Sequence, residues 1–138
     1  MESFVLHQRL AADTRAVADW GLSRVLLMND ARYPWLILVP RRAGLVELHD
    51  LKHAERLVLM EEIARAGAAL KSLTGCAKIN TGALGNLVPQ LHVHVVARGP
   101  GDAAWPGPVW GQGTAEPYAA AALATRLGEL RAALGGRS

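Results

Sequence analysis

Polar and apolar residues alternate between Gln90 and Ala97, in the run Gln-Leu-His-Val-His-Val-Val-Ala. Alternation over a segment of this length predicts a β-strand with two different faces. On such a strand Gln90, His92 and His94 share one face, whereas the residues between them point into the opposite, apolar layer. The chain is therefore expected to form a sheet that packs a core on one side and presents two imidazoles on the other.

Three further runs predict strands. Residues 23–28 and 35–39 are short β-favouring runs separated by turn residues, which predicts an antiparallel pair. Residues 77–81 predict a third strand ahead of the histidine strand. No internal repeat or linker divides the chain, so 1–138 is expected to be a single domain.

Two helices are expected. Asp50 is a good N-cap for a helix that runs to about Thr74, where Gly75 ends it. Its apolar residues repeat at steps of four and three, as in one buried stripe, and these are Leu59, Ile63, Ala66, Leu70 and Leu73. A C-terminal helix is expected over about 117–134. Strands, a helix and further strands in this order predict an antiparallel α+β domain.

Composition excludes several classes of protein. The chain of 138 residues is 51% hydrophobic and 20% charged, as in a globular domain, and its one cysteine cannot form an internal disulfide. Charged residues cross the first 20 positions and no long apolar run exists, so we expect a cytoplasmic protein with no membrane contact. The net charge of +3 and a single Arg-Arg doublet do not favour nucleic-acid binding.

The two histidines leave three interpretations open: a solvated pair, a metal site, or an acid/base or nucleophilic site. A metal site needs a third ligand, for which His7, His49, His53 and Asp102 are candidates that no spacing recommends. The preceding loop favours catalysis, because Gly85 allows backbone N–H groups to approach a bound anion. An imidazole can attack an activated phosphorus while its neighbour stabilises the developing charge.

The run from Gln90 to Val96 resembles the signature of the histidine triad (HIT) superfamily of nucleotide hydrolases and transferases, His-φ-His-φ-His-φ-φ with φ apolar. The resemblance covers roughly residues 24–108. It extends to Asp30, Leu38-Val39-Pro40, Asn80, the Gly85 loop and Trp105-Pro106. The Gln that begins the motif and the Trp-containing tail are similar to a bacterial branch of the superfamily.

The resemblance implies a HIT-like fold with an antiparallel sheet of about five strands, one long helix and a C-terminal helix. It also implies that His92 is the nucleophile of a covalent nucleotidyl-histidine intermediate and that His94 contacts phosphate oxygens or the leaving group. Asp30 would hold the ribose hydroxyls. The phosphate would contact Asn80 and the loop residues Gly85, Asn86 and Val88. A homodimer is expected on the same grounds.

Two positions depart from the family pattern. Gln90, which the resemblance counts with His92 and His94 as a catalytic residue, stands where a histidine is usual. It can donate and accept hydrogen bonds but cannot shuttle a proton near pH 7. Leu87 replaces a residue that is often polar. We expect a preference for good leaving groups, such as those of dinucleoside polyphosphates or adenylates, over phosphoramidates. The scheme requires no cofactor or metal, although Mg²⁺ can accompany a polyphosphate substrate.

Two alternatives remain open. One is a nucleotide-binding protein with little turnover, in which the presence of Gln90 in place of a histidine has lowered the catalytic rate. The other is a metal-dependent hydrolase that uses His92 and His94 as ligands. Trp105 and Trp110, in the irregular segment 100–113, are expected to anchor that segment by packing rather than to stack on a substrate. The resemblance adds a third option, in which this segment lies close to the site of the partner in a dimer.

Overall fold

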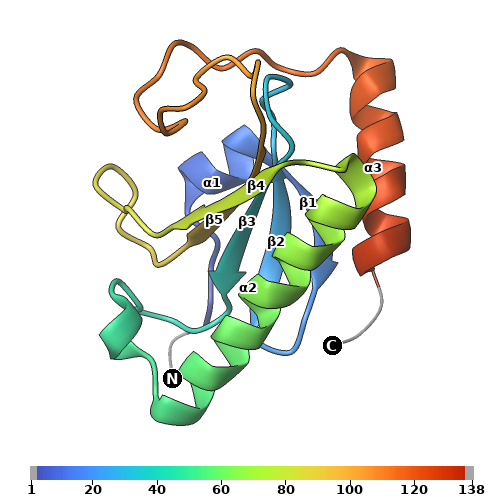
Figure 1. Cartoon of the computed structure of the whole chain (residues 1–138). Helices are drawn as coiled ribbons and strands as arrows, with labels where there is room; N and C mark the ends of the chain where they lie inside the picture. The colour runs from blue at the N-terminus through green and yellow to red at the C-terminus, as the bar shows by residue number, and fades with distance from the viewer. Residues whose placement is uncertain (1–2, 136–138) are drawn as a thin grey trace.

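The structure is a computed structural model that describes residues 3–135. Within these residues five strands form one antiparallel sheet in the order β1-β2-β3-β5-β4 (Figure 1). The expected α+β fold with a five-stranded antiparallel sheet is confirmed. The elements in chain order are α1 (Gln8–Asp13), β1 (Thr14–Asp19), β2 (Ser23–Met28), β3 (Trp35–Pro40), the 3-10 helix η1 (Leu48–Asp50), α2 (His53–Thr74), β4 (Lys78–Gly82), β5 (Val93–Arg98) and α3 (Ala120–Leu134).

Both faces of the sheet are covered, which explains why all six residues of β3 are buried. One face packs against α2 and α3, which lie side by side in Figure 1. Leu36 and Leu38 point into this layer together with Val95 of β5, as their alternation predicts. The residues contributed by the two helices are Ala66, Leu70, Leu127, Leu130 and Leu134.

The opposite face of the sheet carries the functional side chains. Trp35 and Ile37 of β3 lie on this face in a second apolar cluster. It is covered by α1 and by irregular segments, and no long helix covers it among the described residues (Figure 1). The different covering of the two faces leaves room for a cavity on the side of the histidines.

The histidine strand is shorter than expected. β5 begins at Val93, not at Gln90, and its ladder with β3 starts at the pair Leu38–Val93. β3 ends at Pro40, which has no N–H to continue the ladder. Instead the Leu91 N–H donates to Leu45 O in the following loop. Gln90 and His92 therefore lie on a stretch that approaches the sheet, and only His94 is inside the ladder.

The sequence prediction that Asp50 is the N-cap of the long helix is wrong. α2 begins at His53 with Lys52 as its N-cap, and the Lys52 N–H donates to the Glu55 carboxylate. The Asp50 carboxylate accepts instead from the N–H groups of Val46 and Glu47 and closes η1. The other end is as expected, because Gly75 ends α2 in the left-handed conformation at φ 66°.

The C-terminal helix begins at Ala120, three residues later than the expected start at Pro117. The segment before it is extended because its N–H groups bond to the turn after β2. The Glu116 N–H donates to Asp30 and the Tyr118 N–H donates to Asn29. Tertiary hydrogen bonds therefore replace the first helical turn that Pro117 suggested.

The N-terminal elements α1 and β1 were not predicted. β1 has charged residues at exposed positions and a bulge between Ala16 and Ala18, so its apolar residues do not alternate cleanly. Within the described part of the chain, no helix combines the length and the apolar character needed to cross a membrane.

A buried carboxylate joins α2 to the sheet. Glu62 is 3% exposed, and its oxygens accept from the backbone N–H groups of Leu22 at 3.0 Å and Ser23 at 3.1 Å. These N–H groups belong to the start of β2 and the turn before it. Glu62 therefore satisfies two buried donors and fixes the position of the helix over the sheet.

Replacement of Glu62 by alanine would leave both buried N–H groups without an acceptor. We expect Glu62→Ala to lower the free energy of unfolding by about 2–4 kcal/mol. Glu61→Ala, which changes the exposed neighbour, is the matched control and should change it by less than about 0.5 kcal/mol. Denaturant unfolding measures both. Equal effects of the two substitutions would contradict the role assigned to Glu62.

Candidate active site

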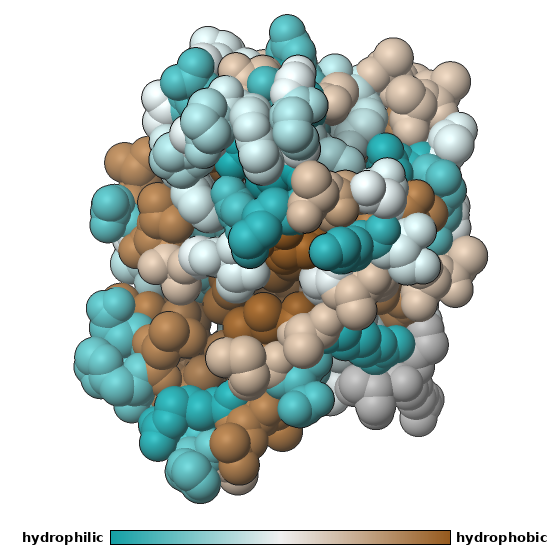
Figure 2. All heavy atoms as spheres, in the orientation of Figure 1, coloured by the Kyte–Doolittle hydropathy of each residue, from teal (hydrophilic) through white to brown (hydrophobic). Residues whose placement is uncertain are grey.

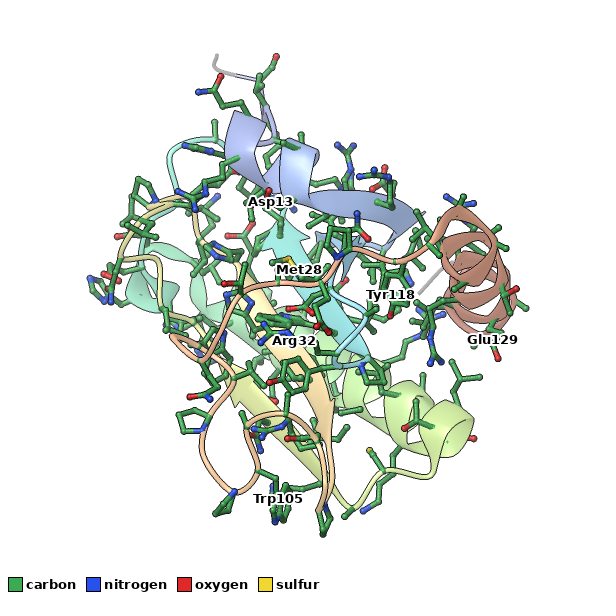
Figure 3. The ribbon with its side chains drawn as sticks, turned by 90° about the horizontal axis from the view of Figure 1, so that it is seen from above. Asp13, Met28, Arg32, Trp105, Tyr118 and Glu129 are labelled. Atoms are coloured by element: carbon green, nitrogen blue, oxygen red, sulfur yellow. The ribbon has the colours of Figure 1, made fainter. Side chains whose placement is uncertain are left out.

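A cavity of about 630 Å³ opens on the histidine face of the sheet. It is lined by side chains from α1, the end of β2, β3 and β5, and by the two loops that precede and follow the histidine strand. In Figure 3 three lining residues, Asp13, Met28 and Arg32, lie in a row from α1 toward the turn after β2. The lining residues include Asp30, Arg32, Trp35, Gly85, Asn86, Val88, His92, His94 and Trp110.

His92 is 6% exposed, and its ring is oriented by the backbone. The distance from His92 Nδ1 to the carbonyl oxygen of Gln90 is 2.7 Å. A carbonyl oxygen can only accept, so Nδ1 carries the proton of the neutral ring and Nε2 carries a lone pair. His92 therefore has the tautomer that a nucleophile acting through Nε2 requires.

His94 is held by aromatic side chains. The indole Nε1–H of Trp35 donates to His94 Nδ1 at 3.0 Å, and both side chains are buried. The rings of Trp110 and His92 also contact His94 edge-to-face, with centroids 5.6 Å and 4.9 Å away. Burial, and secondarily the charge of His92, lowers the pKa of His94 to about 4. His94 is therefore neutral near pH 7.

The loop before the histidines lines the cavity from Leu84 to Val88. Gly85 adopts φ 73°, a conformation that favours glycine, and this turns the following peptides. Within residues 3–135 the backbone N–H groups of Asn86, Leu87 and Val88 have no hydrogen-bond acceptor. Adjacent N–H groups without acceptors are suited to binding an anion. The Leu87 side chain is 78% exposed.

Asp30 also lines the cavity, but its carboxylate is largely occupied. Arg32 donates to both of its oxygens, at 3.0 Å from Nε and 2.8 Å from Nη2. Oδ1 also accepts from the N–H groups of Arg32 and Glu116. Burial alone would raise the pKa of Asp30, but these hydrogen bonds outweigh it and hold the pKa below its usual value. Within the described chain Oδ2 accepts one hydrogen bond, so it retains a lone pair.

The Gln90 side chain bonds to the N-terminal segment. Its Oε1 accepts from the His7 N–H and its Nε2 donates to the Val5 carbonyl, each at 2.8 Å. The amide thus pairs with the backbone just before α1, the helix whose Arg9 and Asp13 line the cavity. Gln90 contributes its backbone carbonyl to the orientation of His92 and its side chain to the placement of α1.

Asn80 is separated from the other predicted site residues. It does not line the cavity, and its Oδ1 accepts from Arg98 at 2.8 Å. Arg98 is 2% exposed and pairs with Asp102, whose pKa it holds well below the usual range. Asp102 also accepts from the Ala104 and Trp105 N–H groups. This network anchors the segment after β5.

Several residues of the cavity were not predicted as site residues, among them Trp35, Arg32 and Trp110. Trp35 was assigned to an apolar strand, Arg32 to a turn, and Trp110 mainly to a packing role. The Trp110 ring packs so closely on Gly82 that a Cβ atom at residue 82 would lie 3.1 Å from it. Trp110 also lines the cavity beside His94. Trp105 is 38% exposed, and the Arg98 guanidinium lies over its ring. Only the spatial pairing of β3 with β5 could have identified Trp35.

Candidate metal ligands do not cluster. In the part of the chain that the structure describes, no three His, Cys, Asp or Glu side chains come together in a way that could hold a metal ion. His49 lines a separate, smaller hollow beside His92, whereas His53 begins α2.

Comparison with known proteins identifies close structural relatives. A histidine triad protein from Bradyrhizobium japonicum is 49% identical, covers 96% of this chain and 99% of its own, and has a TM-score of 0.93. A histidine triad (HIT) protein from Sinorhizobium meliloti is 47% identical, with coverage of 95% and 97% and a TM-score of 0.92. A histidine triad protein from Marinobacter aquaeolei is 44% identical, with coverage of 96% and 97% and a TM-score of 0.94.

A comparison with curated proteins finds no significant match. The family model described as the HIT domain matches residues 9–101, which include the Gly85 loop, His92 and His94. Since this match spans most of the chain and the structural relatives align over nearly all of it, the chain belongs to the HIT domain family.

Proposed function

We propose that this protein hydrolyses or transfers nucleotides at the α-phosphorus through a covalent nucleotidyl-His92 intermediate. Family membership supports the broader class of nucleotide-binding hydrolases and transferases. The observation that carries the proposal is the 2.7 Å contact between His92 Nδ1 and Gln90 O. It leaves the Nε2 lone pair of a neutral imidazole on a residue that lines the cavity.

The reaction has two steps. His92 Nε2 attacks the α-phosphorus, a P–N bond forms, and the P–O bond to the leaving group breaks with its electron pair on the leaving oxygen. Water or another acceptor hydroxyl then attacks the same phosphorus and loses a proton to solvent. The P–N bond breaks and the imidazole is restored. Each step replaces one bond to phosphorus by another, so the scheme requires no cofactor.

The loop after Gly85 is the proposed phosphate cradle. The N–H groups of Asn86, Leu87 and Val88 can donate to the phosphoryl oxygens, and they are placed to stabilise charge that develops during attack. These donors belong to the backbone, so the exposed Leu87 side chain does not remove them. Asn80 remains a predicted phosphate contact, but its present partner Arg98 would have to release it.

Asp30 is proposed to bind one ribose hydroxyl through Oδ2. Arg32 fixes the orientation of the carboxylate and neutralises its charge, and Oδ1 is already occupied by three N–H donors. Asp30 therefore has capacity for one hydroxyl hydrogen bond, fewer than the two-hydroxyl contact expected from the sequence.

The alternatives are less well supported. A metal site at His92 and His94 would need a third ligand, and both Nδ1 atoms already have partners. Mg²⁺ is proposed only as a companion of a polyphosphate substrate. A binding protein with little turnover would retain the cradle and Asp30. The orientation of His92 by a backbone carbonyl favours the enzyme, since this contact does not depend on the Gln90 side chain.

A homodimer remains a proposal, and so does the cytoplasmic location. β4 is an edge strand followed by the exposed Leu84, and further apolar side chains are exposed elsewhere on the surface (Figure 2). In that view they gather over the loop around η1 and the first half of α2. The exposed residues are Val46, Leu48, Leu57, Val58, Met60 and Leu84. A strand edge with apolar neighbours is suited to pairing with a second chain.

Intact-mass spectrometry with AMP-bearing substrates tests the mechanism. We expect wild-type protein to form an AMP adduct, and His92→Ala to form none and to lose at least about 1,000-fold in product release. His53→Ala changes an exposed histidine and should behave like wild type. An adduct that persists in His92→Ala would contradict the assignment of the nucleophile. Nucleotide binding without an adduct or product in wild type would favour the binding protein.

Asp30→Asn tests the ribose contact. The neutral amide accepts a hydroxyl hydrogen bond less strongly, so KM for a ribonucleotide substrate should rise about 10-fold. The KM for the 2′,3′-dideoxy counterpart should stay within about 2-fold of the wild-type value for that substrate. Comparison of the two substrates on the same variant separates this effect from any general disturbance of the fold. Equal increases would refute the contact.

Gln90→Ala tests whether the Gln90 side chain has a structural or a catalytic role. The Gln90 carbonyl that orients His92 is retained, so we expect the AMP adduct to form with kcat within about 3-fold of wild type. Loss of the two hydrogen bonds to residues 5 and 7 should lower the free energy of unfolding by about 1–2 kcal/mol. A kcat reduced 100-fold or more in a fully folded variant would instead show that the amide takes part in catalysis.

A further inference from the structure

The hydrogen bond between Trp35 and His94 determines which nitrogen of His94 carries a proton. The indole Nε1–H is only a donor, so His94 Nδ1, 3.0 Å away, must accept with its lone pair. The neutral ring then carries its proton on Nε2. This is the reverse of His92, whose Nδ1–H donates to a carbonyl oxygen. The two imidazoles are thus fixed in opposite tautomers, one with a lone pair at Nε2 and the other with a proton there.

The surroundings of His94 oppose a second proton. Protonation at Nδ1 would place an N–H against the indole N–H in a site where Trp35 is 6% and His94 is 8% exposed. The other groups packed around His94 are Ile37 across the ladder on β3, Gly82 across the ladder on β4, and Trp110. These groups do not titrate. His92 does, and if it carried a proton its charge would repel a positive charge on His94.

We propose that Trp35 is a positioning residue that holds His94 as a neutral Nε2–H donor, so that the site gives the leaving group a hydrogen bond but no proton. The inference rests on the proposed function and names its substrate class. Leaving groups that depart as stable anions are favoured, as in mixed anhydrides, polyphosphates and aryl esters. Phosphoramidates and alkyl esters are disfavoured, since a departing amine or alkoxide needs a proton.

The bond changes agree with this assignment. When His92 Nε2 bonds to phosphorus, the P–O bond breaks and the leaving oxygen keeps the electron pair. His94 retains its Nε2 proton and donates it only as a hydrogen bond to the developing negative charge. The sequence analysis expected the same preference for good leaving groups because Gln90 and Leu87 differ from the family pattern. Here the preference follows instead from the hydrogen bond of Trp35 to His94.

The imidazole nitrogens can be observed directly by ¹⁵N NMR of histidine-labelled protein, with His94→Asn used to assign the His94 signals. In wild type we expect His94 Nδ1 to resonate as an unprotonated acceptor, Nε2 as protonated, and both signals to stay unchanged from pH 8 to pH 5.5. An Nδ1-protonated tautomer, or an imidazolium that forms at pH 6, would overturn the proposal. This measurement needs no substrate and no further variant.

Trp35→Phe removes the donor and keeps an aromatic ring. We expect its His94 to populate both tautomers and to take up a proton at a pH at least one unit higher than in wild type. Trp105→Phe, which alters a tryptophan remote from His94, is the control and should leave the His94 signals unchanged. A Trp35→Phe spectrum identical to that of wild type would also overturn the proposal.

Substrate preference provides the functional test. Wild type should cleave an aryl ester of AMP at least 100-fold faster than an AMP phosphoramidate at pH 7, and Trp35→Phe should narrow this ratio at pH 6 by at least 3-fold. Equal rates on the two substrates in wild type would overturn the proposal. If no nucleotide substrate is turned over, the proposed function fails, and the ¹⁵N spectra still decide whether Trp35 fixes the tautomer.

Discussion

The antiparallel pairing of β3 with β5 is the constraint on which the site depends. It places His94 opposite Ile37 and brings the Trp35 indole within hydrogen-bond distance of the His94 ring. It also stops at Leu38–Val93, so the chain before β5 leaves the ladder and the Gln90 carbonyl can reach the His92 ring. One strand pair therefore determines the orientation of both imidazoles.

Segments from both ends of the chain complete the cavity around this centre. The N-terminal segment is attached through the Gln90 amide, and the segment after residue 109 through Asn29, Asp30 and Arg32. Because Arg32 bonds to Asp30 and also to the Gln112 carbonyl, the proposed ribose contact and the closure of the cavity depend on one ion pair. Residues far apart in sequence thus form one wall.

Much of the fold could be predicted from local pattern. The strand pair at 23–28 and 35–39, the stripe on α2 and the end of α2 at Gly75 follow from periodicity and backbone preference, which act over a few residues. The start of α2, the late start of α3 and the strand β1 did not follow. Tertiary hydrogen bonds delay α3, and a bulge disturbs the alternation of β1. The late start of α2 has a local cause, because the Asp50 carboxylate closes η1 by accepting from Val46 and Glu47.

The sequence by itself determined that His92 and His94 belong to one site with a glycine-containing loop, since alternation on a strand and the freedom of Gly85 are local properties. The tertiary structure alone decided which hydrogen-bond partner each group has. The Gln90 amide bonds to the N-terminal segment, and Asp30 pairs with Arg32. Asn80 accepts from Arg98, and His94 accepts from Trp35. Hydrogen-bond partners fix tautomers and free lone pairs, and these partners come from strands and loops that only folding brings together.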